Sequence, residues 1–506
     1  MTEIETQEMY SRRRRRTQEK KKDSYNSQFK ERLLPTKWWP ALLWSTLFGA
    51  FSVANPYLTQ FATNLQTQSL YAGMAMREGQ IPYSDFFGTN GVLYYLMTYL
   101  GAIFQPAILL GFFQFVALLI AGLYFYKIIS YFSQSEKTAT NFSHWFYIFV
   151  FAINFGGIYA GIFALPFTLT SIWFLVRYFE NAVRDEAFIL YGIDAALVFL
   201  IYPKSLILWL IASLILFIYN ATHRQMARGF YQFLATLFGF LLIVYAIGYY
   251  AFETQILGLA IQQTFLYNIN LGFTYDGIVL TLVLVAVFLL FSGFLKNIFQ
   301  TLFSLGQKQH TYIKVVILLT FLLQTVFIVG SVDFQWTQLL LLLPYGFVMS
   351  AIHLQIEELE DFDNEGVEVS YLKHQFFLPL LVAILIPVQP LYHYFIDADV
   401  YQERVELASY IKDNSDEESL IYTWDSSAYV YLESQRLSSA SLVTAEPYLH
   451  TEDNQNSLTY DLNKNEAQFI LVNKGIPLLE GIKTNLEEHY KLVETGTSYL
   501  ALYEKK

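Results

Sequence analysis

The residues best suited to chemistry lie in the stretch 62–95, which follows the first long apolar run of this 506-residue chain. The stretch holds only two acidic side chains, Glu78 and Asp85. Asp85 has aromatic neighbours on both sides, in the run PYSDFF of residues 82–87. A partly dry aromatic pocket raises the pKa of a carboxyl group and suits it to general-base catalysis. We therefore predict Asp85 as a catalytic base, with a turn or helix cap as the alternative, because Ser-Asp after proline is common in turns.

Two isolated cations are candidates for binding a phosphate. Arg77 ends a helical-looking segment, and a guanidinium group binds phosphate through two parallel hydrogen bonds. Lys204 lies in a tight turn after Pro203. The alternative for both is a side chain that extends from an apolar surface to water. We predict a substrate-binding group made of Arg77, Glu78, Tyr83 and Lys204.

The composition identifies a membrane protein. Hydrophobic residues make up 54% of the chain and charged residues 15%, against about 25% charged residues in soluble proteins. There is no cysteine, and the eight histidines show no metal-ligand spacing. We predict no metal ligands and no certain cofactor, and leave open whether a divalent metal ion is needed.

Eleven apolar runs approach the length of about 20 residues that crosses a bilayer. They are 38–58, 106–132, 142–159, 161–179, 187–202, 205–220, 230–252, 277–299, 312–331, 337–354 and 375–396. The shorter run 91–104 indicates a helix on the membrane surface or a re-entrant helix, within an outer loop 59–105. The domain 38–396 is thus expected to be transmembrane.

The distribution of charge sets the predicted orientation. With residues 1–37 inside, the inner segments hold 21 of the 32 Lys and Arg residues, and the outer loops hold two, Arg77 and Lys204. This asymmetry is what the positive-inside rule requires. We predict a plasma-membrane protein with a basic cytoplasmic tail, 1–37, that contacts the lipid bilayer rather than nucleic acid.

An odd number of spans places the acidic tail 397–506 outside. Short β-rich runs alternate there with helical segments, which indicates a small α/β domain. The fold class expected is therefore a polytopic α-helical membrane protein with about eleven transmembrane helices and a small extracytoplasmic α/β domain.

Further acidic residues lie within predicted spans, near their outer ends or in an inner loop. Asp194 falls within a predicted span, where a structural role is expected. Glu253, Asp276 and Asp333 lie near predicted outer ends, and any of them could line an outer cavity. The acidic run 357–368 is expected to be a solvated inner loop.

The order of these parts resembles the GT-C superfamily of membrane glycosyltransferases, such as protein O-mannosyltransferases and aminoarabinose transferases. Five stretches carry the resemblance: 71–85, with its closing PYSD; 91–95 (GVLYY); 202–204 (YPK); 333–344, which begins DFQW and ends LP; and 422–436, which ends YLESQR. The resemblance implies transfer of a sugar from a polyprenyl-phosphate carrier at the outer face. The implied partners are a lipid-linked sugar as donor and a cell-envelope glycan, teichoic acid or protein as acceptor.

The chain departs from the family at one informative place. The family usually has an acidic pair shortly before the loop tyrosine, and these positions are Thr67 and Gln68 here. Neither side chain can accept a proton. The alternatives are therefore a non-catalytic protein that binds or flips a lipid-linked glycan, or a transporter.

Overall fold

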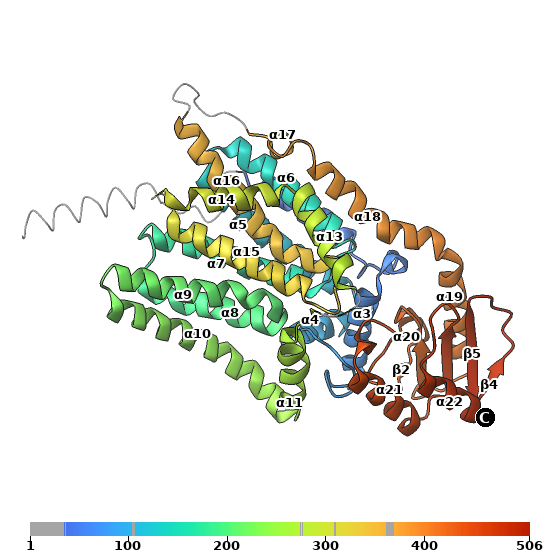
Figure 1. Cartoon of the computed structure of the whole chain (residues 1–506). Coiled ribbons are helices and arrows are strands. Elements are labelled where there is room, and N and C mark those ends of the chain that lie inside the picture. Colours follow the sequence, from blue (N-terminus) through green and yellow to red (C-terminus); the bar gives the residue numbers. More distant parts are fainter. Residues whose placement is uncertain are drawn as a thin grey trace, which may run out of the picture.

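The computed structural model describes residues 35 and 37–506, apart from 104–106, 274, 276, 308–309 and 361–368. The basic tail 1–37, Asp276 and most of the acidic run 357–368 therefore lie wholly or almost wholly outside the described residues. Figure 1 shows a bundle of long helices with a small sheet-containing domain at one end of it.

Long apolar helices make up the bundle. Their bounds are α2 (Trp39–Ala50), α5 (Ile108–Ser133), α6 (Glu136–Ile153), α7 (Ala160–Phe179), α8 (Phe188–Ile201), α9 (Ile207–Thr222), α10 (Met226–Glu253), α13 (Ile278–Phe291), α14 (Phe294–Phe303), α15 (Thr311–Val329), α16 (Leu343–Glu360) and α18 (Pro379–Ile396). Shorter pieces connect them, namely η2 (Asp185–Ala187), η3 (Pro203–Leu206), α11 (Leu257–Ala260), η4 (Ile261–Leu266), α12 (Tyr267–Ile269), η5 (Ser304–Gly306), η6 (Trp336–Leu342) and α17 (Tyr371–His374).

The helix lengths support the membrane assignment, but they do not confirm the expected number of eleven spans. Among the described residues, six helices are long and apolar enough to cross a bilayer. A seventh span results if α13 and α14 count as one, although they meet at a 75° bend. This bend falls at Gly293, whose φ of +79° lies in the left-handed region that glycine adopts without strain. Every predicted span coincides with a helix, but α2 and α8 have only 12 and 14 residues.

The described part of the loop, 59–103, folds into a compact unit of η1 (Thr59–Phe61), α3 (Asn64–Arg77) and α4 (Val92–Ile103). The Gln66 amide begins α3, because its oxygen accepts the Thr63 N–H at 2.8 Å. Gly91 lets the loop approach the end of α8, since a Cβ atom there would lie 2.1 Å from the Leu200 carbonyl oxygen. The Gly91 N–H also donates to the Ile201 carbonyl. The loop is therefore fixed against the turn that follows α8.

The small sheet expected in the tail is present, with strand order β2-β1-β3-β5-β4. Its strands are β1 (Leu420–Trp424), β2 (Leu437–Ser438), β3 (Phe469–Asn473), β4 (Tyr490–Val493) and β5 (Leu500–Lys505). The strand β1 is parallel to β2 and β3, whereas β5 is antiparallel to β3 and β4. The accompanying helices are α19 (Ala398–Asp413), α20 (Tyr429–Ser434), η7 (Tyr448–His450), α21 (Glu452–Lys464) and α22 (Glu480–His489).

Candidate functional site

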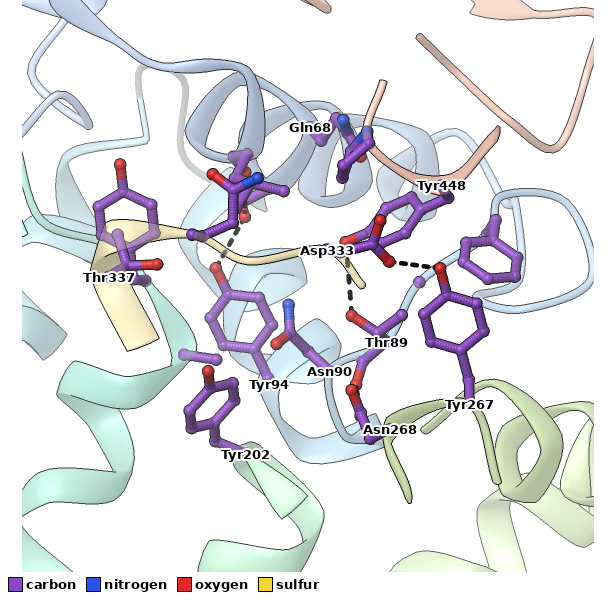
Figure 2. Close-up of a pocket in the computed structure, with 18 of the residues that line it drawn as sticks. Gln68, Thr89, Asn90, Tyr94, Tyr202, Tyr267, Asn268, Asp333, Thr337 and Tyr448 are labelled. Atoms are coloured by element: carbon purple, nitrogen blue, oxygen red, sulfur yellow. Dashed lines mark hydrogen bonds between the residues drawn. The ribbon is translucent and has the colours of Figure 1, made fainter. Parts of the chain in front are cut away.

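A cavity of about 1250 Å³, counted out to its mouth, lies where the loop 59–105, the bundle and the C-terminal domain meet. Figure 2 shows polar and aromatic side chains from all three parts around this space. The polar residues on its wall that the figure labels include Gln68, Asn90, Asn268, Asp333 and Thr337.

Lys204 brings a positive charge to this cavity. The helix α8 ends at Ile201, and Pro203 then begins the short η3, where its missing N–H costs nothing. This break places Lys204 on the cavity wall. No hydrogen bond or salt bridge joins Lys204 to another side chain in the part of the chain that the structure describes, and the negative charge of Asp333 acts on its ammonium group. An anionic ligand could therefore pair with this ammonium group.

Asp333 brings a negative charge to the same cavity from the loop between α15 and η6. Its Oδ2 accepts a hydrogen bond from the Tyr267 hydroxyl at 2.5 Å, and its Oδ1 lies 3.0 Å from Nδ1 of His450. Figure 2 shows the contact with Tyr267. The hydrogen bond to Asp333 raises the pKa of His450, while burial and the negative charge of Asp333 raise the pKa of Tyr267. Each carboxylate oxygen has two lone pairs, so Asp333 can accept a further hydrogen bond from a ligand hydroxyl.

Neighbouring polar contacts hold this wall in place. The Gln338 side chain donates to the Asp333 carbonyl at 3.0 Å. Asn268 donates to the Thr89 carbonyl at 2.8 Å, and the Thr89 hydroxyl lies 3.4 Å from that of Tyr448. Burial raises the pKa of Tyr448 to about 12, which keeps its hydroxyl protonated. The site is thus built jointly by the bundle, the loop and the C-terminal domain.

Two buried amide side chains on the wall have atoms without a hydrogen-bond partner. Among the described residues, neither side-chain atom of Asn154 has a hydrogen-bond partner, and neither does the side-chain oxygen of Gln338. Buried polar groups are almost always satisfied by protein, water or ligand. These amides are therefore available to a polar ligand in the cavity.

The sequence-predicted residues are not brought together. Of Asp85, Arg77, Glu78, Tyr83 and Lys204, only Lys204 is among the described residues that line the cavity. The Asp85 carboxylate accepts the Ile81 N–H at 2.7 Å, which is the turn role named as its alternative. The buried Tyr83 hydroxyl donates to the Asn90 carbonyl at 2.8 Å.

Arg77 and Glu78 form a pair at the surface beside the C-terminal domain. Their side chains meet at 2.8 Å, and Nη2 of Arg77 also lies 3.3 Å from the Gln435 side-chain oxygen. Both residues lie outside the set that lines the cavity.

The positions where the resemblance expects acids contact the C-terminal domain instead. The Thr67 hydroxyl, which is almost fully buried, accepts the Ala428 N–H at 3.0 Å. The Gln68 side chain donates to the Thr444 hydroxyl at 2.8 Å. A third contact comes from the Tyr71 hydroxyl, which accepts the Ser438 N–H at 2.9 Å. This face of α3 therefore serves to dock the domain.

Sequence reasoning had no means of selecting Asp333 from the other acids near predicted outer ends. Its two partners, Tyr267 and His450, lie 66 and 117 residues away along the chain. Only the folded structure shows that these three side chains meet.

Family models cover nearly all of the chain. Residues 27–398 match the model described as "Putative competence-induced protein Ccs4 N-terminal domain". Residues 401–506 match the corresponding Ccs4 C-terminal domain. A search of curated proteins found no match.

Solved structures of an archaeal enzyme share a distant likeness to the chain. One is the oligosaccharyltransferase AglB of Archaeoglobus fulgidus in complex with an inhibitory peptide and a dolichol-phosphate, at 11% identity and a TM-score of 0.49. The alignment covers 92% of this chain and 74% of that one. The other is the oligosaccharyltransferase of the same organism with Zn and sulfate, at 11% identity and a TM-score of 0.42, covering 92% and 73% of the two chains.

Proposed function

We propose that this chain, which belongs to the family of competence-induced Ccs4 proteins, is a membrane glycosyltransferase that moves a sugar from a polyprenyl-phosphate carrier to a cell-envelope acceptor. The observation that carries the proposal is the shared cavity of Lys204 and Asp333. Glycosyl transfer from a phosphate carrier needs a cation at the leaving phosphate and a proton acceptor at the attacking hydroxyl. The cavity offers one group of each kind, beside helices that are apolar enough to cross a membrane.

In the proposed reaction, the acceptor hydroxyl attacks the anomeric carbon of the carrier-bound sugar. A new carbon–oxygen bond forms while the bond from the anomeric carbon to the phosphate oxygen breaks, and the phosphate leaves with the bonding electrons. Lys204 stabilises the charge on the departing phosphate, and Asp333 takes the proton of the attacking hydroxyl. The hydrogen bonds from Tyr267 and His450 hold the carboxylate in position.

The proposed orientation places the N-terminus in the cytoplasm and the C-terminal domain outside, with eleven spans. The absence of cysteine from the sequence makes this testable without removing any native residue. A single cysteine placed at Lys474, on the C-terminal domain, should react with a membrane-impermeant maleimide in intact cells. A single cysteine at Arg184, between α7 and α8, should react only after the membrane is opened. The reverse pattern would overturn the orientation.

Transfer itself is tested with membranes that contain the full-length protein, a labelled polyprenyl-phosphate sugar and an envelope extract. We expect Asp333→Asn to lower the rate at least 100-fold, because it removes the proton acceptor and leaves the shape unchanged. Asp85→Asn is the matched control and should retain transfer, since the Asp85 carboxylate holds a local turn. Full activity of Asp333→Asn would overturn the assignment.

A second candidate function is favoured by one observation. The positions where the GT-C superfamily usually has an acidic pair are Thr67 and Gln68 in this chain. Both side chains make contacts that hold the C-terminal domain. A protein that binds or flips a lipid-linked glycan without transferring it would fit this feature. Binding of the carrier that depends on Lys204, with no transfer in any extract, would favour this alternative.

A further inference from the structure

A second cavity, of about 1840 Å³ counted out to its mouth, adjoins the candidate site. It lies between η1, the start of α3, the end of α18, α19 and the C-terminal domain. Five residues line both cavities: Leu65, Tyr159, Gln335, Thr337 and Pro447. Through these shared residues the second cavity adjoins the cavity wall that carries Asp333, the proposed proton acceptor.

Aromatic rings form much of the second cavity's wall. Phe61 and Tyr394 stack with centroids 4.3 Å apart and planes 26° from parallel. Trp336 and Tyr401 contribute two further rings. Such rings present flat apolar faces, and those of Tyr and Trp also carry a polar tip.

The polar groups of this wall are mostly neutral. The amide side chains of Gln60, Gln335 and Gln402 can each donate and accept hydrogen bonds, as hydroxyl groups do. Arg404 is the one cation among the described lining residues, and two hydrogen bonds of 2.6 and 2.9 Å commit it to the buried Asp425. The acidic residues Asp397 and Glu446 also line the space.

We infer that the second cavity binds a neutral oligosaccharide, which is the acceptor of the transfer proposed above and on which this inference rests. Flat aromatic faces fit the apolar faces of sugar rings, and neutral amides match sugar hydroxyl groups. The acceptor classes left open by the sequence were a glycan, a teichoic acid and a protein.

A teichoic acid is a polyanion, and the charges oppose it. The cavity's cation, Arg404, is already paired with Asp425, and two acidic residues, Asp397 and Glu446, also line the space. The domain that forms one wall, residues 397–506, holds 20 Asp and Glu residues against nine Lys and Arg residues. Like charges brought together on binding are strongly unfavourable.

The cavity lining offers no sheet edge to which the backbone of a protein acceptor could pair. Extended peptides are commonly captured by adding a strand to an exposed sheet edge. None of the described lining residues belongs to a strand of the C-terminal sheet. The cavity therefore offers side chains, rather than a row of backbone groups, to its ligand.

The test measures binding to the full-length protein in lipid nanodiscs by saturation-transfer NMR and titration calorimetry. The probes are a panel of neutral oligosaccharides, polyglycerol phosphate and an uncharged Ser-rich peptide. We expect a neutral oligosaccharide to bind, and Tyr394→Ala to weaken it at least tenfold. Phe395→Ala is the matched control, because it removes an adjacent ring that is 72% exposed and outside the cavity. Both variants must keep the wild-type thermal midpoint to within a few degrees.

Tighter binding of polyglycerol phosphate or of the peptide would overturn the inference. Equal loss in Tyr394→Ala and Phe395→Ala, or no binding by any neutral oligosaccharide, would also overturn it. A separate measurement with a short-chain polyprenyl phosphate distinguishes this failure from failure of the proposed function. Lys204→Ala should abolish binding of the polyprenyl phosphate and leave oligosaccharide binding unchanged. If the lipid still requires Lys204 while no oligosaccharide binds, only the acceptor inference fails.

Discussion

The contact between His450 and Asp333 should make docking of the C-terminal domain depend on pH. His450 lies on η7 of that domain, and Asp333 lies on the loop before η6 of the bundle. The groups that face the imidazole are the Asp333 carboxylate, the Tyr267 ring at 5.9 Å and the Pro447 backbone. The pair is therefore a titratable link between two parts of the molecule.

The direction of the pH dependence follows from the raised pKa of His450 in the docked state. Below the ordinary histidine pKa of about 6.5, the imidazole is protonated whether or not the domain is docked, and the pair contributes in full. As the pH rises through the higher pKa of the docked state, the imidazole loses its charge and the contribution falls. Docking is thus predicted to be tightest under acidic conditions.

The pH-dependent part of the docking free energy is small. Hydrogen bonds to charged groups contribute about 1.5–3 kcal/mol, and fully exposed ion pairs about 0–1 kcal/mol. The two side chains are 30% and 13% exposed, so the pair lies between these cases. Because a neutral imidazole can still donate one hydrogen bond, we expect deprotonation to lose about 1 kcal/mol, or roughly a fivefold change in the docking equilibrium.

Hydrogen–deuterium exchange of the segments 331–335 and 448–451, corrected for intrinsic rates, measures this change between pH 5.5 and 8.5. Wild-type protection should fall with rising pH, and His450→Gln should remove the pH dependence. His489→Gln is the control. The side chain of His489 belongs to the same domain but is 57% exposed, and its Nε2 lies 3.8 Å from the nearest oxygen of its acidic neighbour, Glu488. The reasoning is refuted if His450→Gln keeps the wild-type pH dependence.

Substitutions at three other positions test separate parts of the structure. Gly91→Ala should destabilise the loop by at least about 1 kcal/mol, seen as a lower thermal midpoint, because its Cβ would overlap the Leu200 carbonyl; an unchanged midpoint would contradict this close approach. Thr67→Val keeps the side-chain shape but leaves the Ala428 N–H without its acceptor, so docking of the C-terminal domain should weaken by about 1–3 kcal/mol. Hydrogen–deuterium exchange at residues 427–429 measures this change, and the same protection in the variant as in the wild type would contradict the docking role. Lys204→Gln should raise the KM for the carrier-linked sugar at least tenfold and Lys204→Arg should partly restore it; equal KM values would show that the charge is not used.

The sequence was sufficient to predict features that depend on composition and local pattern. The apolar runs located the helices of the bundle, and the β-rich runs of the tail located β1, β3 and β5. Lys204 could be selected because it is one of two cations in predicted outer loops. The number of spans was harder to predict, because α2 and α8 are short and the α13–α14 pair is bent at Gly293.

The sequence could not select Asp333, the proposed proton acceptor, because its surroundings depend on tertiary structure. Asp85 has aromatic neighbours along the chain, but its carboxylate is used by the backbone four residues earlier. Asp333 has the more suitable surroundings, and these come from α12 and η7, far away in sequence. Local sequence context therefore favoured Asp85, whereas the contacts that single out Asp333 come only from the tertiary structure.

The arrangement has a consequence for how activity would be controlled under the proposed function. If the acid lay on α3, it would be present whether or not the C-terminal domain was docked. Here α3 instead supplies the docking contacts of Thr67 and Gln68, and the proposed acid is held in part by His450 of the docked domain. Docking and positioning of the proton acceptor are thus coupled through one interface. A variant with weakened docking, such as Thr67→Val, should therefore transfer sugar more slowly while still binding the carrier phosphate at Lys204. If transfer and phosphate binding fall equally in this variant, the interface only supports the fold.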